Sequence, residues 1–335
     1  DYKIYVNVHK TIADSLYWDE TPIPLPTSLS EPVDQRTVYY KNKYYTLTAD
    51  LEGNVSLSTA AHPADEASSR TLSMAFIPRV ETFTATNSAL FILDTEGKLY
   101  TSSNGLRWSS TGQTWSSITA PYGDTLVGIA DNDGSLFHVT YPATVTSPVK
   151  TNFPVNGNSQ VIRYATDWGQ QAQVITVGGL GADGVPTPSV WAYDGKTWAC
   201  INSSTPMAAQ GITVVPYYYC QTDTNTWIST THSVLLAMGG RMSDNKMLSD
   251  NYISYDLGFN WVKAPSVMQP DKKFPTLYDA QAFIVNEEQH SRAVKPITEW
   301  DTPFIYLYGG RKAGGSLSPA IYRGVIKRLE FKPLQ

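Results

Sequence analysis

Two arginines stand directly after Gly-Gly pairs, in Gly239-Gly240-Arg241 and Gly309-Gly310-Arg311. Each arginine precedes a polar or glycine-rich loop. A guanidinium can hold a carboxylate through two parallel hydrogen bonds, so two arginines on one surface could bind an acidic ligand. The alternative is that each arginine caps a neighbouring loop or pairs with a local acid such as Asp244 or Asp250.

A third Gly-Gly pair, Gly178-Gly179, is followed by Leu180 and, after two residues, by Asp183, so it lacks the arginine. A site built from the three loops would therefore be asymmetric. Trp168 follows Tyr164 in a loop and could stack on a sugar face, although packing at the rim is the simpler alternative. We predict ligand binding by Arg241, Arg311, Asp183 and Trp168.

Other reactive side chains are few and scattered. The five histidines are spread along the chain at His9, His62, His138, His232 and His290. Cys200 and Cys220 have neither Cys-x-x-Cys spacing nor nearby histidines, so we expect no metal site and no cofactor. The two cysteines either form a disulfide, in an oxidising compartment, or remain as buried free thiols.

The composition favours an all-β protein. Aromatic residues make up 12% of the 335 residues and charged residues only 16%, while Gly (23) and Pro (21) supply many turns. The net charge of −5 gives no electrostatic footprint for nucleic acid. No apolar run reaches the length of a membrane span.

Repeated strand endings indicate the architecture. Apolar runs at 174–177, 234–238 and 304–308 each stop at a Gly-Gly pair, where glycine allows the chain to break sharply into a loop. In the other half, a turn of the form Asp-x-acid-Gly-x-aliphatic follows an apolar run at 50–55, 94–99 and 131–136, which predicts three hairpins. These six units predict a six-bladed β-propeller of four-stranded antiparallel blades.

Turns that end in tryptophan occur late in several units. Residues Ser254 to Trp261 fit Ser-x-Asp-x-Gly-x-x-Trp, residues Thr101 to Trp108 are a degenerate copy with Ser103 in place of Asp, and Asp194 to Trp198 is a shorter version. In such a turn the acid bonds to amides and the tryptophan packs between neighbouring sheets, so the role is structural.

The N-terminal residues do not share the repeat. Residues 1–20 read as the end of an upstream β domain or an edge strand, 21–35 as a Pro-rich linker, and 36–335 as the propeller. We expect a last strand from Ile321 to Phe331. It should pair with N-terminal material, because an open ring would leave exposed sheet edges.

The segments from Val174 to Trp198 and from Val234 to Trp261 resemble kelch repeats, with Gly-Gly, a later tyrosine and then a tryptophan. The third copy departs by having no final tryptophan. The Ser-x-Asp-x-Gly-x-x-Trp turn resembles the Asp box. The mixture resembles six-bladed exported propellers of gut Bacteroidetes, which implies a lipoprotein in the periplasm or on the outer-membrane surface.

Kelch domains bind partners through arginines after the diglycine, which the resemblance carries to Arg241 and Arg311. We therefore predict a monomeric, non-catalytic module that binds a glycan or a protein on the face bearing the diglycine loops. The alternative is a sialidase-like or other glycan-cleaving propeller, which would need three arginines around a carboxylate and a Tyr–Glu pair. Arg163, Arg241, Arg311 and Arg323 are the candidates for that triad.

Overall fold

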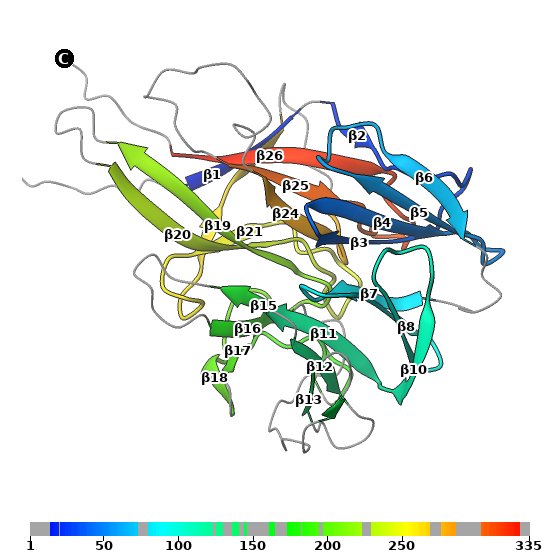
Figure 1. Cartoon of the computed structure of the whole chain (residues 1–335). Helices are drawn as coiled ribbons and strands as arrows, with labels where there is room; N and C mark the ends of the chain where they lie inside the picture. Colours follow the sequence, from blue (N-terminus) through cyan, green and yellow to red (C-terminus); the bar gives the residue numbers. More distant parts are fainter. Residues whose placement is uncertain are drawn as a thin grey trace, which may run out of the picture.

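The computed structural model describes residues 14–19, 21–72, 80–122, 125–129, 136–140, 144–145, 161–164, 173–181, 183–193, 197–222, 229–268, 276–285 and 303–328. Strands account for all of its regular elements within these residues. They form five four-stranded antiparallel blades and one six-stranded sheet, which we call the closing sheet. Figure 1 shows the sheets following one another in chain order until the last strands reach the first.

Blades 1 and 2 contain the predicted acidic hairpins. Blade 1 consists of β3 (Asp34–Tyr40), β4 (Lys43–Ala49), β5 (Val55–Ala60) and β6 (Ser68–Leu72). Blade 2 consists of β7 (Val80–Ala85), β8 (Leu90–Asp94), β9 (Lys98–Ser102) and β10 (Ser109–Thr114). The turns behave as predicted, because Asp50 Oδ1 accepts the Asn54 amide at 2.8 Å and Asp94 Oδ1 accepts the Lys98 amide at 2.8 Å.

Blades 3 to 5 complete the regular part of the ring. Blade 3 comprises β11 (Ser117–Tyr122), β12 (Thr125–Ile129), β13 (Leu136–Thr140) and β14 (Thr144–Val145). Blade 4 comprises β15 (Val161–Tyr164), β16 (Gln173–Val177), β17 (Val190–Tyr193) and β18 (Trp198–Asn202). Blade 5 comprises β19 (Thr213–Thr222), β20 (Ser229–Met238), β21 (Asn251–Ser254) and β22 (Val262–Ala264). The turn of the third acidic hairpin, at 130–135, lies outside the described residues, although β12 and β13 pair as expected.

The closing sheet joins the two ends of the chain. Its order is β23–β1–β26–β25–β24, with β2 also paired to β26. The strands are β1 (Asp14–Trp18), β2 (Ile23–Pro24), β23 (Ser266–Met268), β24 (Gln281–Val285), β25 (Phe304–Tyr308) and β26 (Ala320–Arg328). The antiparallel pairing of β1 with β26 confirms that the last strand closes on N-terminal material.

The prediction of six four-stranded blades preceded by an N-terminal strand is wrong. The structure has five four-stranded blades, and the closing sheet differs from them in strand number and in its parallel β1–β23 pair. The physical reason is that β1 lies inside the ring's last sheet, between β26 and β23, where it covers an edge that would otherwise be exposed. The division of the chain at residues 20 and 36 stays a prediction.

The hydrophobic core lies in the seams between neighbouring sheets. Along β20, Leu235 and Ala237 pack with blade 4 residues, whereas Val234, Leu236 and Met238 pack with the closing sheet. Successive side chains of a strand point to opposite faces, so one apolar run serves two seams. The first strands of successive sheets, β3, β7, β11, β15, β19 and β24, contact one another in order and surround a common axis.

The tryptophan turns connect adjacent blades. Asp256 Oδ1 accepts the Asn260 amide at 2.8 Å, Ser254 Oγ accepts the Gly258 amide at 2.8 Å, and Trp261 packs on a cluster shared with blade 4. In the degenerate copy the acid's place is taken by Asn104, whose Oδ1 accepts the Leu106 amide at 2.9 Å, and not by Ser103. The turns are therefore structural features at the seams.

Candidate functional site

The three diglycine loops have the same backbone geometry. In each loop the first residue after the diglycine forms a β-bridge with a residue on the opposite side of the loop. The three pairs are Leu180–Pro186, Arg241–Met247 and Arg311–Leu317. Each then closes a tight turn, with the amides of Gly181, Met242 and Lys312 donating to the carbonyls of Val185, Lys246 and Ser316. Leu180, Arg241 and Arg311 are thus equivalent positions, as the sequence spacing predicts.

The glycines are required by contacts between sheets. Gly239 has a φ of 64°, and a Cβ at this position would collide with the carbonyl oxygen of Leu277, just before the closing sheet begins. The next amide, that of Gly240, donates to the same oxygen at 2.9 Å. In the loop between β16 and β17 of blade 4, Gly179 donates in the same way to the Ala209 carbonyl at 2.9 Å. The diglycine therefore bonds the end of a sheet's second strand to the segment that precedes the first strand of the next sheet.

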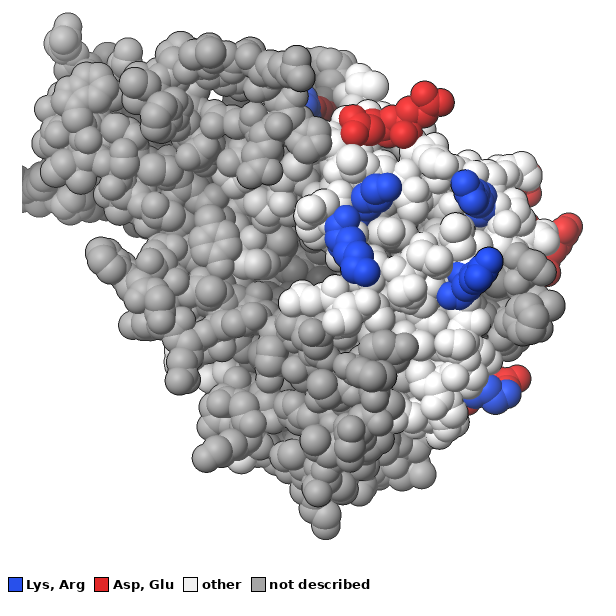
Figure 2. Space-filling model, in the orientation of Figure 1, with Lys and Arg blue, Asp and Glu red and all other residues white. Residues whose placement is uncertain are grey.

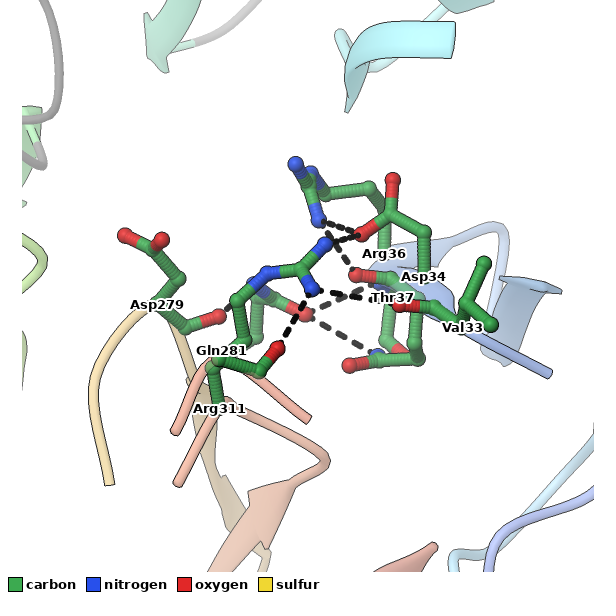
Figure 3. Close-up of polar contacts among 9 residues, drawn as sticks. Val33, Asp34, Arg36, Thr37, Asp279, Gln281 and Arg311 are labelled. Atoms are coloured by element: carbon green, nitrogen blue, oxygen red, sulfur yellow. Dashed lines mark hydrogen bonds and ion pairs between the residues drawn. The ribbon is translucent and has the colours of Figure 1, made fainter. Parts of the chain in front are cut away.

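Arg311 holds the seam between the closing sheet and blade 1 (Figure 3). Its Nη2 donates to Asp34 Oδ1 at 2.8 Å, and its Nη1 donates to the carbonyls of Val33 and Gly315 at 3.2 and 3.0 Å. Arg36 Nη1 donates to the same Asp34 oxygen at 2.6 Å. One carboxylate is thus shared by two guanidinium groups.

Glutamine side chains continue this seam towards the axis. Gln281 Oε1, from β24, accepts the side-chain amide of Gln35 at 2.9 Å and the backbone amide of Thr37 at 3.2 Å. Gln281 Nε2 donates to the carbonyl of Asp279 at 2.9 Å. These bonds fix β24 against β3 and thereby fix the polar groups at the start of both strands.

Arg241 lies on the same face in a different environment. Its Cζ lies 5.4 Å from the ring centroid of Tyr278, which pairs through its backbone with Arg311. The Nε of Arg241 is buried and has no hydrogen-bond partner among the described residues. The acids on its own loop pair elsewhere: Asp244 with Lys246 at 2.6 Å and Asp250 with Lys263 at 2.7 Å. The planar guanidinium is therefore held over a ring, and neither acid of its own loop pairs with it.

Asp279 adds a carboxylate to this arrangement. Its backbone has a φ of 56°, a conformation that aspartate tolerates better than most residues, and its side chain makes no hydrogen bond to a described residue. Burial raises the pKa of its carboxyl above the ordinary value, while the positive charges of Arg36, Arg311 and Arg241 oppose that shift. The negative charge of Asp34 raises the pKa of Asp279, as burial does. We call Asp34, Arg36, Arg241, Asp279 and Arg311 the axial cluster.

The structure brings together two of the four predicted site residues. Arg241 and Arg311 lie in the axial cluster, and both contact Tyr278. Asp183 is exposed on the loop between β16 and β17 of blade 4, where its Oδ1 accepts the Val185 amide at 3.0 Å. Trp168 lies outside the described residues. Arg323, a candidate for a sialidase-type triad, instead pairs with Asp19 and lies over Phe304.

Sequence reasoning missed Asp34, Arg36 and Asp279. They lie at or just before the start of the inner strands β3 and β24, where no diglycine marks the position. No local sequence pattern marks them: Asp279, for example, is placed by its backbone amide, which donates to the carbonyl of Gly211 at 2.8 Å.

Cys200 is free and exposed, so it is neither in a disulfide nor buried. Within the described residues, no cluster of three His, Cys, Asp or Glu side chains could hold a metal ion. No helix among those residues could cross a membrane.

Sheets arranged around an axis, with a polar cluster where the inner strands begin, define a β-propeller. The family model described as "DUF6242 beta propeller domain" matches residues 12–334, and the chain belongs to this family. No curated protein matches the chain in sequence.

Among solved structures, the chain is similar to the N-terminal domain of Nup159, with 13% identity, a TM-score of 0.41 and coverage of 88% of this chain and 76% of that chain. An arginine-to-alanine triple mutant of AofleA from Arthrobotrys oligospora is 8% identical, with a TM-score of 0.45 and coverage of 93% and 86%. YCF48 from Cyanidioschyzon merolae is 11% identical, with a TM-score of 0.43 and coverage of 91% and 98%. At these scores the likenesses carry no argument about function.

Proposed function

We propose that this propeller is a non-catalytic binding module and that the axial cluster binds a carboxylate of an acidic glycan or an acidic protein segment. The observation that carries the proposal is Arg241, whose guanidinium lies over Tyr278 with a buried Nε that has no described partner. A guanidinium fixed in this way keeps the rotamer that a bidentate bond to a carboxylate requires.

The two arginines have different tasks in this proposal. Arg311 already shares Asp34 with Arg36 and bonds two carbonyls, so it positions the cluster and supplies positive potential. Arg241 supplies the direct contact. The Asp279 carboxylate, with no hydrogen bond to a described residue, can accept a hydroxyl or an amide of the same ligand. Asp183 and Trp168 stay in the proposal as further ligand-binding residues.

The cellular setting belongs to the proposal as well. The kelch-like and Asp-box-like patterns support an exported propeller, in the periplasm or as a lipoprotein on the outer-membrane surface. There an acidic polysaccharide or a surface protein would be accessible to a monomeric domain.

An array that carries acidic glycans and acidic peptides, each paired with its carboxyl-reduced or amidated form, tests the proposal. We expect binding to some carboxylated probes and at least tenfold weaker binding to their neutral partners, because a charge-assisted bidentate pair is lost. Equal binding to both forms, or binding to neither, would contradict the carboxylate site.

A glycan-cleaving enzyme is the second candidate, and one observation favours it. Three arginines, Arg36, Arg241 and Arg311, lie close enough to Asp279 to act on its ionisation. The tyrosine beside them is Tyr278, and the acids of the cluster are aspartates where a sialidase would need a glutamate for its tyrosine. Turnover of a sialoside or of a mixed glycan panel by the purified protein would establish this candidate and overturn the non-catalytic one.

A further inference from the structure

A cavity lies away from the axial cluster, between blade 1 and the closing sheet. Its volume is about 400 Å³, and its wall includes the N-terminal segment 23–27, strands of blade 1 and the loop from Pro63 to Ala67. This volume falls within the range of small-molecule sites in proteins. None of the axial cluster residues lines it.

Two tyrosines form the inner wall of this cavity. Tyr44 is 6% exposed and Tyr308 is 1% exposed, and neither hydroxyl has a hydrogen-bond partner among the described residues although both side chains line the cavity. Their rings stack at 6.1 Å between centroids, and Phe283 meets both edge-on. A phenol that opens into a cavity and has no described protein partner can bond a molecule held there. Burial raises the pKa of both phenols, which keeps them protonated as hydrogen-bond donors.

The charged residues of the wall have one sign. Asp65 and Glu66 are exposed members of the lining, and no lysine or arginine belongs to it. Figure 2 shows acidic side chains gathered on the described surface over β2. Acids at the mouth and electron-rich rings inside attract a cation and repel an anion. Pro24, Pro26 and Leu25 supply apolar surface beside them.

We propose that this cavity is a second binding site and that it takes a small organic ammonium compound with an apolar body. The ammonium lies near Asp65 and Glu66, the apolar body contacts the prolines, and a polar atom bonds the hydroxyls of Tyr44 and Tyr308. The site is chemically opposite to the axial cluster and does not depend on it. Because its walls come from both sides of the seam, an occupant stabilises the closed ring.

Calorimetric titration of the whole chain with phenethylamine, phenylacetate and 2-phenylethanol tests this inference, because the three probes share size but differ in charge. We expect saturable one-to-one binding of phenethylamine, at least tenfold tighter than that of the other two probes and weaker at high salt. Absence of saturable binding, or equal affinity for phenylacetate, would overturn the proposal.

Two double variants locate the binding. Asp65→Asn with Glu66→Gln removes the charges, and Tyr44→Phe with Tyr308→Phe removes the hydroxyls while keeping the rings. The first pair should weaken phenethylamine binding by about tenfold or more, because it removes the charges that face the ammonium. The second pair should weaken binding of tyramine by a similar factor, because the phenol of tyramine supplies the polar atom that phenethylamine lacks. Glu81→Gln, on blade 2, is the matched control and should leave the affinity unchanged. Wild-type affinity in both double variants would place the amine elsewhere and refute the site.

Discussion

At the scale of single residues, glycine and arginine positions are defined by what lies across a seam. Gly239→Ala should lower the free energy of unfolding by about 3 kcal/mol or more, because it adds backbone strain and a collision with the Leu277 carbonyl. Gly184→Ala is the matched control: its φ of 74° is similar, but no atom lies within 4 Å of the added Cβ. It should cost only about 1 kcal/mol, from strain alone. Equal losses in urea unfolding would show that the contact between sheets is not the reason for the glycine.

The contacts of Arg311 predict that its removal lowers stability, and a variant of the neighbouring Lys312 is the control. Arg311→Ala removes the bonds to Asp34, Val33 and Gly315, and we expect a loss of about 1–3 kcal/mol in the free energy of unfolding. Lys312→Ala, at an exposed position, should change stability by less than about 0.5 kcal/mol. If denaturant midpoints of both variants match wild type, Arg311 is free to bind ligand and does not hold the seam.

The raised pKa of Asp279 predicts how the free energy of unfolding changes with pH. Its native carboxyl has a raised pKa, so between the ordinary value of 3.8 and that raised value the folded state binds more protons than the unfolded state. The contribution of Asp279 to the free energy of unfolding therefore falls as the pH rises through that window, and it stays lower above the window. Asp279→Asn, which tolerates the same positive φ, removes the effect.

Unfolding measured from pH 3 to 8 checks this. The variant should gain stability relative to wild type as the pH rises, and the gain should vanish below pH 3.8. A constant difference across the range would mean that the carboxyl of Asp279 is not perturbed in the native protein.

At the scale of elements, β1 holds the ring closed. Leu16 is fully buried in the closing sheet, so Leu16→Ala should lower stability by about 2–5 kcal/mol. Leu51, in a hairpin turn of blade 1, is 84% exposed, so Leu51→Ala should change stability by less than about 0.5 kcal/mol. Both variants carry the same leucine-to-alanine change. Equal melting midpoints of the two variants in calorimetry would refute the role of β1.

The elements that sequence could predict are those with local signals. The hairpin turns at Asp50 and Asp94 depend on an acid and a glycine a few residues apart, and the diglycine strands end where an apolar run meets residues with positive φ. The pairing of β1 with β26 was predicted from the cost of open edges. The parallel pairing of β1 with β23 was not, because Leu16 and Ser266 are far apart in sequence and share no local pattern.

At the scale of the molecule, repeat signals predicted a ring of sheets but not how many strands each sheet contains. Counting turns assigned every unit the same four strands, whereas closure places both chain ends in one six-stranded sheet. The same non-locality explains the site. Arg241 and Arg311 follow recognisable glycines, but Asp34, Arg36 and Asp279 join them only when blade 1 meets the closing sheet.

The proposed binding function depends on direct contact between Arg241 and an acidic ligand at the axial cluster. Titration of wild type, Arg241→Ala and Lys246→Ala with the tightest carboxylated probe from the array tests it most directly, since Lys246 lies exposed on the same loop. We expect Arg241→Ala to lose at least tenfold in affinity at unchanged thermal stability and Lys246→Ala to bind as wild type. Wild-type affinity in Arg241→Ala, or equal losses in both variants, would contradict the account.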